Sequence, residues 1–69
     1  MNQTLEKILF EKYPKIFAEH KLTPNETSMC FGISTGDGWF WLIDSLCSHL
    51  QFYTDENNNI IRKQFRNKT

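Results

Sequence analysis

Two cysteines and two histidines are the side chains that could ligate a metal or support nucleophilic catalysis: Cys30, Cys47, His20 and His49. A metal site needs several such ligands converging at fixed spacing. Cys47 and His49 lie two residues apart in a stretch with helical periodicity, which points them about 200° away from each other. They cannot chelate one ion together, and we expect neither a metal site nor a cofactor.

Nucleophilic catalysis would need one of the thiols beside a histidine, with a carboxylate such as Asp44 to orient the imidazole. The spacing of these residues does not bring them together. Cys47 lies beside an apolar stripe, as a small core residue does. Asp37 stands just before a glycine and an apolar run, which is the position of a helix N-cap. We therefore expect a protein without enzymatic activity.

The aromatic run of Trp39, Phe40 and Trp41 is the cluster best suited to binding. Successive helical residues are about 100° apart, so three in a row cannot share one face. Trp39 falls on the apolar stripe, whereas Phe40 and Trp41 are either covered by other segments or displayed, and displayed aromatic side chains are typical of binding hot spots. We expect the partner-binding residues to lie in a patch on this helix or at the basic C-terminal end: Phe40, Trp41, Gln51, Phe52, Tyr53, Arg62, Lys63 and Arg66.

An amphipathic helix is predicted near the N-terminus, because apolar residues recur at three-to-four-residue spacing from Leu5 to Phe17. Pro14 interrupts it, since proline lacks a backbone donor and disfavours helical geometry at the preceding residue. The sequence therefore predicts a break near Lys12 or Tyr13, followed by a short second helical segment.

A long central helix is predicted from Gly38 to about Phe52 or Tyr53. Gly36 permits a positive φ in the turn before it, and Asp37 can cap its first turn. One stripe then recurs at helical spacing: Trp39, Leu42, Ile43, Leu46, Leu50 and Tyr53. Residues 29–33, just upstream, form a short apolar run that predicts a brief extended segment.

The last stretch, residues 54–69, allows two interpretations. Ile60, Ile61 and Phe65 give the narrow apolar stripe of a third helix, whereas three consecutive asparagines favour a turn, followed by a strand from Asn59 to Phe65. We favour the helix, because an isolated strand has no evident partner. The fold class predicted is mainly α: a three-helix domain with a kinked first helix, a long central helix and a loop or short extended segment between them.

The length and charge of the chain narrow the classes of protein. Its 69 residues fit one small domain, and its eight basic and eight acidic residues cancel, so no overall field draws it to nucleic acid or to an anionic membrane. The basic end, residues 62–69, carries four cations and no acid, against eight acids and four lysines in residues 1–61 (4 − 8 = −4). Two cysteines, no leader-like N-terminus and no long apolar window predict a cytoplasmic protein with reduced thiols and no membrane span.

The stretch "MCFGISTGDGWFWLIDSLCSHLQFY" resembles small, uncharacterised proteins of phages and prophages. They share a "KYPKIF" first helix, a loop with a methionine–cysteine pair, and a "GDGW" turn that opens a "LID.LC" helix. The likeness covers roughly residues 11–52, and Trp41 stands where the pattern would have a polar residue. The resemblance implies a phage accessory origin and transfers no active site.

These observations lead us to expect a non-enzymatic protein that binds another protein. A phage origin would make inhibition of a host defence complex, such as a CRISPR effector, the use of that binding. An incompletely covered aromatic face would also allow a homodimer through antiparallel packing of the central helices. The alternative is a nucleic-acid-associated accessory protein that uses Arg62, Lys63, Arg66 and Lys68.

Overall fold

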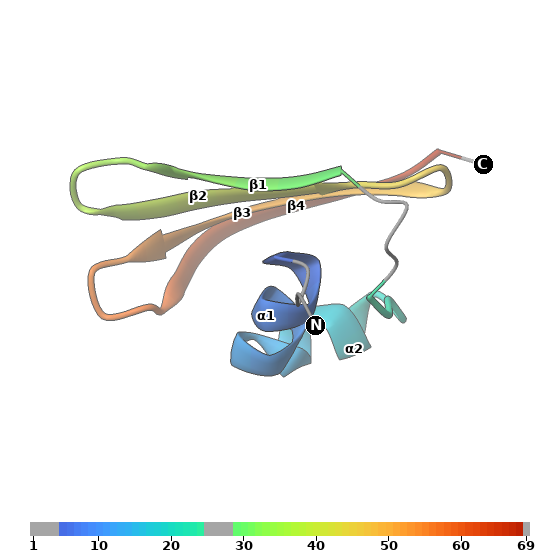
Figure 1. The fold of residues 1–69 in the computed structure, drawn as a ribbon, viewed down its shortest axis with the longest axis horizontal. Helices are drawn as coiled ribbons and strands as arrows, with labels where there is room; N and C mark the ends of the chain where they lie inside the picture. Colours follow the sequence, from blue (N-terminus) through green and yellow to red (C-terminus); the bar gives the residue numbers. More distant parts are fainter. Residues whose placement is uncertain (1–4, 25–28, 69) are drawn as a thin grey trace.

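The structure, a computed structural model, describes residues 5–24 and 29–68, and within them two short helices precede a four-stranded antiparallel sheet (Figure 1). The elements are α1 (Leu5–Lys12), α2 (Pro14–Glu19), β1 (Met29–Ser34), β2 (Gly38–Asp44), β3 (Ser48–Asp55) and β4 (Ile60–Asn67). The strands follow one another in the order β1-β2-β3-β4. The predicted three-helix fold is therefore wrong, because four of the six elements in the described residues are strands of one sheet.

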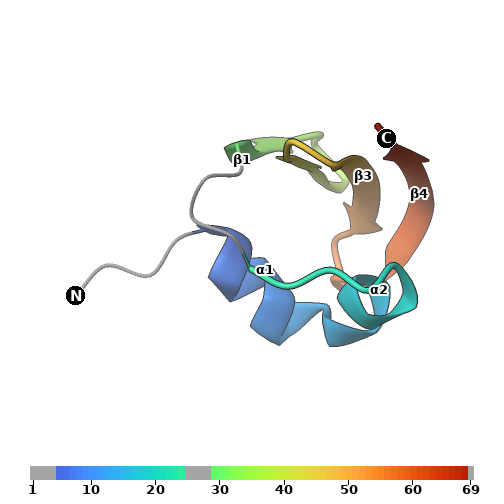
Figure 2. The same cartoon turned by 90° about the vertical axis from the view of Figure 1, so that its right-hand side faces the viewer.

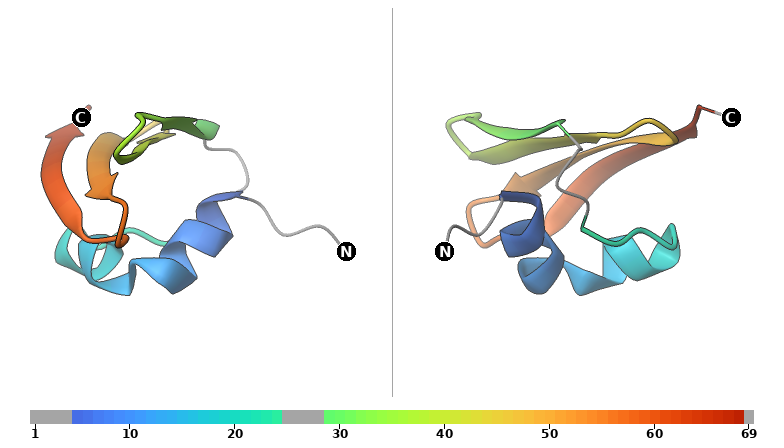
Figure 3. Two further views of the ribbon diagram at one scale, coloured as in Figure 1. Left: turned by 90° about the vertical axis from the view of Figure 1, so that its left-hand side faces the viewer. Right: turned by 45° about the vertical axis from the view of Figure 1, so that its right-hand side comes forward.

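The N-terminal helical region agrees with the sequence prediction. α1 ends at Lys12, Tyr13 leaves helical geometry with φ −127° and ψ 59°, and Pro14 occupies the first turn of α2. This is the position where the missing backbone donor of proline costs nothing. Both helices lie on the same side of the sheet (Figures 1 and 3).

The predicted central helix is wrong, because residues 38–53 form two strands joined by a tight turn at residues 45–47. In β3, buried and half-buried side chains alternate strictly, which is the period of a strand and not of a helix. Leu46, expected on the buried stripe, lies in the turn and is 89% exposed. The β2–β3 turn is held by Ser45, whose backbone N–H donates to the Ser48 carbonyl at 2.9 Å.

The turns around the sheet explain the glycine and asparagine clusters. Gly36 has a φ of 92° in the β1–β2 hairpin, so the "GDG" stretch forms a strand connection and not a helix start. In the β3–β4 turn, Asp55 Oδ1 accepts hydrogen bonds from the backbone N–H groups of Asn57 and Asn59, each at 2.9 Å, and Asn58 adopts a φ of 66°. The third helix is wrong; the competing strand interpretation is confirmed by β4, and the brief extended segment by β1.

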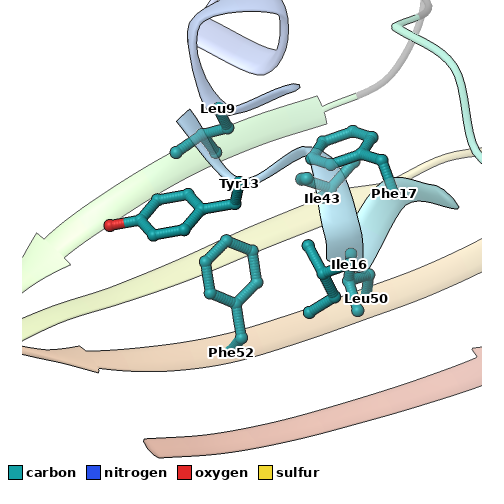
Figure 4. Packing of buried hydrophobic residues seen from close by; sticks show 7 residues of the cluster. All are labelled: Leu9, Tyr13, Ile16, Phe17, Ile43, Leu50 and Phe52. Carbon is teal, nitrogen blue, oxygen red and sulfur yellow. The ribbon is translucent and has the colours of Figure 1, made fainter. Parts of the chain in front are cut away.

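The core lies between the helices and one face of the sheet (Figure 4). Its buried apolar side chains come from the helical region and from the two central strands: Leu9, Tyr13, Ile16, Phe17, Ile43, Leu50 and Phe52. The Tyr13 ring meets the Phe52 ring edge-on at a centroid distance of 5.3 Å. Burying one such side chain stabilises the fold by roughly 1.5–3 kcal/mol.

Trp41 covers the one glycine within β1. Gly32 pairs with Trp41 across the β1–β2 ladder, and a Cβ on Gly32 would overlap the Trp41 ring. The Trp41 ring also stacks on Trp39, with centroids 5.4 Å apart and an interplanar angle of 18°. The absent side chain at position 32 therefore lets a large ring lie flat on the helix side of the sheet.

Gly32→Val tests this packing, because the added side chain would push the Trp41 ring from its position. We expect a loss of about 1–3 kcal/mol in the free energy of unfolding, measured by urea titration. Ser34→Val is the matched control, since Ser34 lies two residues further along the same strand and is exposed. Equal stability of the two variants would contradict the Gly32–Trp41 contact.

Candidate functional site

The face of the sheet turned away from the helices carries the candidate site. Side chains alternate along a strand, so the neighbours of the buried Ile43, Leu50 and Phe52 point away from the helices. We call this surface the open face, because no helix in the described part of the chain covers it (Figure 3). Its side chains, strand by strand, are Met29, Phe31, Ile33, Phe40, Leu42, Asp44, His49, Gln51, Tyr53, Arg62, Gln64 and Arg66.

The strand register aligns four of these side chains in one row across the sheet. Ile33 is opposite Phe40, Phe40 is opposite Tyr53, and Tyr53 is opposite Arg62. The Phe40 and Tyr53 ring centroids are 4.8 Å apart, and Arg62 Cζ lies 5.7 Å from the Tyr53 centroid. Phe31 extends the aromatic contact, 6.5 Å from Phe40. The row runs from an aliphatic end to a cationic end.

The β1–β2 half of the open face is apolar and exposed. Met29, Phe31 and Ile33 are 57%, 37% and 53% exposed, and Phe40 and Leu42 beside them are half-buried. A contiguous apolar surface rimmed by polar groups is typical of interaction sites.

The β3–β4 half of the open face is polar and cationic. A hollow of about 310 Å³ is lined there by Gln51, Tyr53, Arg62, Lys63 and Gln64, and all of these except Lys63 are residues of the open face. Arg62 and Gln64 are exposed on the strand at the sheet edge. The hollow therefore offers guanidinium and amide donors beside an aromatic ring, which suits a carboxylate.

A polar network closes one end of the open face, next to the β2–β3 turn. His49 Nδ1 lies 3.2 Å from Asp44 Oδ1, Lys68 Nζ lies 2.6 Å from the same oxygen, and Gln51 Nε2 lies 2.7 Å from His49 Nε2. Lys68 also donates to the Ser45 carbonyl at 2.8 Å. Hydrogen bonds from Lys68 and His49 hold the pKa of Asp44 below its ordinary value.

The Cys30 thiol does not join this network, and Cys47 is an exposed residue of the β2–β3 turn. Cys30 is opposite Ile43, so its side chain lies on the helix side of the sheet, whereas His49 lies on the open face. Burial, with a smaller contribution from Glu6, raises the pKa of Cys30 to about 11, which leaves the thiol protonated at neutral pH. Within residues 5–24 and 29–68, no three metal-binding side chains of His, Cys, Asp or Glu come together.

The structure divides the eight predicted partner-binding residues between the two sides of the sheet. Phe40, Gln51, Tyr53, Arg62 and Arg66 lie together on the open face. The other three lie on the helix side. Phe52 is fully buried in the core, Trp41 lies over Gly32 against the core, and Lys63 Nζ contacts both Glu19 carboxylate oxygens at 2.6 and 2.7 Å.

Four apolar residues of the open face were missing from the predicted patch: Met29, Phe31, Ile33 and Leu42. The alternation of Met29, Phe31 and Ile33 with smaller residues is visible in the sequence, but the sequence does not tell which of the two faces packs inward. The direction follows only from pairing with β2, which turns the small residues Cys30, Gly32 and Ser34 toward the helices.

Comparison of the chain with family models, with curated proteins and with solved structures gave no match. Neither described helix is long and apolar enough to cross a membrane. The homodimer predicted from antiparallel packing of central helices cannot form in that way, because the segment predicted as the central helix forms the strands β2 and β3.

Asp44→Asn tests the network through pH. The lowered pKa of Asp44 means that its carboxylate stabilises the fold above the unfolded-state pKa, near 4, and that this stabilisation is lost as pH falls through the folded-state pKa. The wild type should therefore exceed Asp44→Asn in stability at pH 7, and the difference should vanish at about pH 2.

Thermal unfolding between these two pH values measures the effect. Lys68→Gln should remove much of the same pH dependence, because the hydrogen bond from Lys68 is the largest cause of the lowered pKa of Asp44. The double variant should lose little more of the pH dependence than Asp44→Asn alone. Identical pH profiles for wild type and Asp44→Asn would contradict the network.

Proposed function

We propose that this is a non-enzymatic protein that binds another protein on the open face of its sheet. The observation that supports it most is the row of Ile33, Phe40, Tyr53 and Arg62, which crosses all four strands and is covered by neither of the two described helices. Aromatic and arginine side chains together are enriched where binding energy concentrates.

The two halves of the open face define the chemistry of the partner. The exposed Met29, Phe31 and Ile33 favour an apolar surface, and the hollow beside Arg62 favours a carboxylate next to it. A guanidinium can hold a carboxylate through two parallel hydrogen bonds, which adds orientation to affinity. The partner that fits is thus a protein surface with apolar side chains flanked by Asp or Glu.

The biological use of this binding is proposed from the resemblance to phage and prophage proteins. A small accessory protein that occupies one surface of a host defence complex, such as a CRISPR effector, inhibits it without chemistry of its own. The proposal requires only that the open face be accessible.

Phe40→Ala and Arg62→Glu test the protein-binding proposal by quantitative capture from bacterial lysate with the tagged full chain. A protein enriched by the wild type should be lost with either variant, because one removes the central ring and the other reverses the charge. Trp39→Ala is the matched control, since Trp39 is an aromatic side chain of the same strand, 42% exposed, on the helix side.

Circular dichroism must show that all three variants keep the fold of the wild type. Equal recovery of the captured protein by wild type, Phe40→Ala and Arg62→Glu would contradict binding on the open face.

A second candidate is the binding of single-stranded nucleic acid, which one observation favours. Arg62 and Arg66 lie on the same face as Phe40 and Tyr53, and cations beside aromatic rings suit phosphates and unstacked bases. Two observations count against it. Lys63 is paired with Glu19 and Lys68 with Asp44, so half of the basic end is neutralised within the molecule.

Fluorescence anisotropy with labelled single-stranded DNA and RNA separates the two candidates. At about 50 mM salt, where electrostatic binding is strong, we expect no binding by the wild type. Binding that weakens steeply with added salt and is lost in Phe40→Ala would support the nucleic-acid function instead.

A further inference from the structure

The two edges of the sheet differ in their protection against pairing with another strand. β4 carries Arg62, Lys63 and Arg66, and its ladder with β3 is irregular near Tyr53 and Thr54. β1, at the other edge, has no charged residue and no proline from Met29 to Ser34. Charges and irregularities are the usual means by which an edge strand avoids further pairing, and β1 has neither.

The outward backbone groups of β1 can be assigned from the hairpin. The Thr35 N–H donates to the Gly38 carbonyl at 3.0 Å, and bonded and non-bonded pairs alternate in an antiparallel ladder. The backbone groups of Met29, Phe31 and Ile33 therefore face β2. Those of Cys30, Gly32 and Ser34 face outward, and in the described part of the chain β1 pairs with β2 alone.

We propose that two copies of this chain pair antiparallel through their β1 edges, about a twofold axis at Gly32, to form one continuous sheet. In this register Cys30 is opposite Ser34 of the second copy, and Phe31 is opposite Ile33 of the second copy.

A second copy fits this edge on steric and electrostatic grounds. On the helix side, Cys30, Gly32 and Ser34 are small, so two such edges can approach without a clash. On the open face, Phe31 and Ile33 meet as an aromatic and β-branched cross-strand pair, which stabilises a sheet. Since β1 carries no charge, two copies do not repel each other there.

The charges on β4 limit the assembly to a dimer. Pairing through β4 would bring Arg62 and Arg66 of two copies together, and like charges on paired strands are destabilising. A twofold interface at β1 therefore gives a closed dimer, and the free edges of the joined sheet are the two charged β4 strands. The curved sheet in Figure 2 shows β1 and β4 at opposite sides, so pairing at one edge leaves the other free.

Sedimentation equilibrium of the full chain tests the dimer, with an expected mass of twice the 8.2 kDa of one chain. Ser34→Pro should shift the protein to monomer, because it removes an outward donor without breaking a β1–β2 hydrogen bond. Asn67→Pro is the matched control on the other edge and should leave the dimer intact. Circular dichroism checks that both variants fold.

Two variants that each introduce one lysine give an independent test of the interface. Ile33→Lys places a charge beside the proposed interface and should weaken dimerisation at least tenfold. Gln64→Lys places the same charge on the open face at the other edge and should not. A wild type with a dimer Kd weaker than about 1 mM, or a dimer that persists in both Ser34→Pro and Ile33→Lys, overturns the proposal. If the wild type is monomeric, the outward edge of β1 stays unpaired and available to a strand of another protein.

Disulfide trapping tests the register. Ser34→Cys, in a Cys47→Ser background, should yield a covalent dimer under oxidation, because opposite bonded residues have Cα atoms about 5.5 Å apart, within disulfide range. Positions 30 and 34 of one chain are about 13 Å apart along the strand and cannot join. Cys30→Ser added to this variant should abolish the product, and a dimeric protein without the product would overturn the register.

Discussion

The packing of two short helices against one face of the sheet is the constraint on which the rest of the structure depends. The buried apolar side chains of α1, the Tyr13 junction and α2 cover Ile43, Leu50 and Phe52, and no third layer lies beyond the sheet in the described residues. Antiparallel sheets tolerate such an arrangement, because successive side chains alternate between a buried face and a solvent-exposed face. Here the solvent-exposed face, the open face, still carries aromatic and aliphatic side chains, and this exposed apolar surface defines the candidate site.

The fold was predictable from the sequence where local chemistry decides it and not where pairing decides it. Pro14 fixes the break between the helices whatever surrounds it, so that prediction is confirmed. In "GWFWLID", apolar residues occupy both faces of β2, and such a run satisfies the helical and the strand period equally. In β3, apolar Leu50 and Phe52 alternate with polar His49 and Gln51, which favours a strand. Leu46, Leu50 and Tyr53 also recur at helical spacing, and this spacing led to the helix prediction.

The candidate site was predictable in its residue types and not in its geometry. Aromatic and cationic side chains were identified, and Phe40, Tyr53 and Arg62 do lie together, but the sheet register that aligns them is a long-range property. Phe52 and Trp41 were included in the predicted patch for the same reason. On a strand, neighbouring side chains point to opposite faces of the sheet, so Phe52 and Trp41 point toward the helices. A basic C-terminal end also looked like a free charge cluster until Glu19 and Asp44 supplied its partners.

The order of the strands has a consequence for how the chain reaches its folded state. Every strand pairs with the one next to it in sequence, so each ladder closes over a short turn and little loop entropy is lost before contacts form. Helices as short as α1 and α2 are unstable alone and must wait for the apolar face that the hairpins create. Local pairing of this kind favours fast folding among proteins built mainly of sheet.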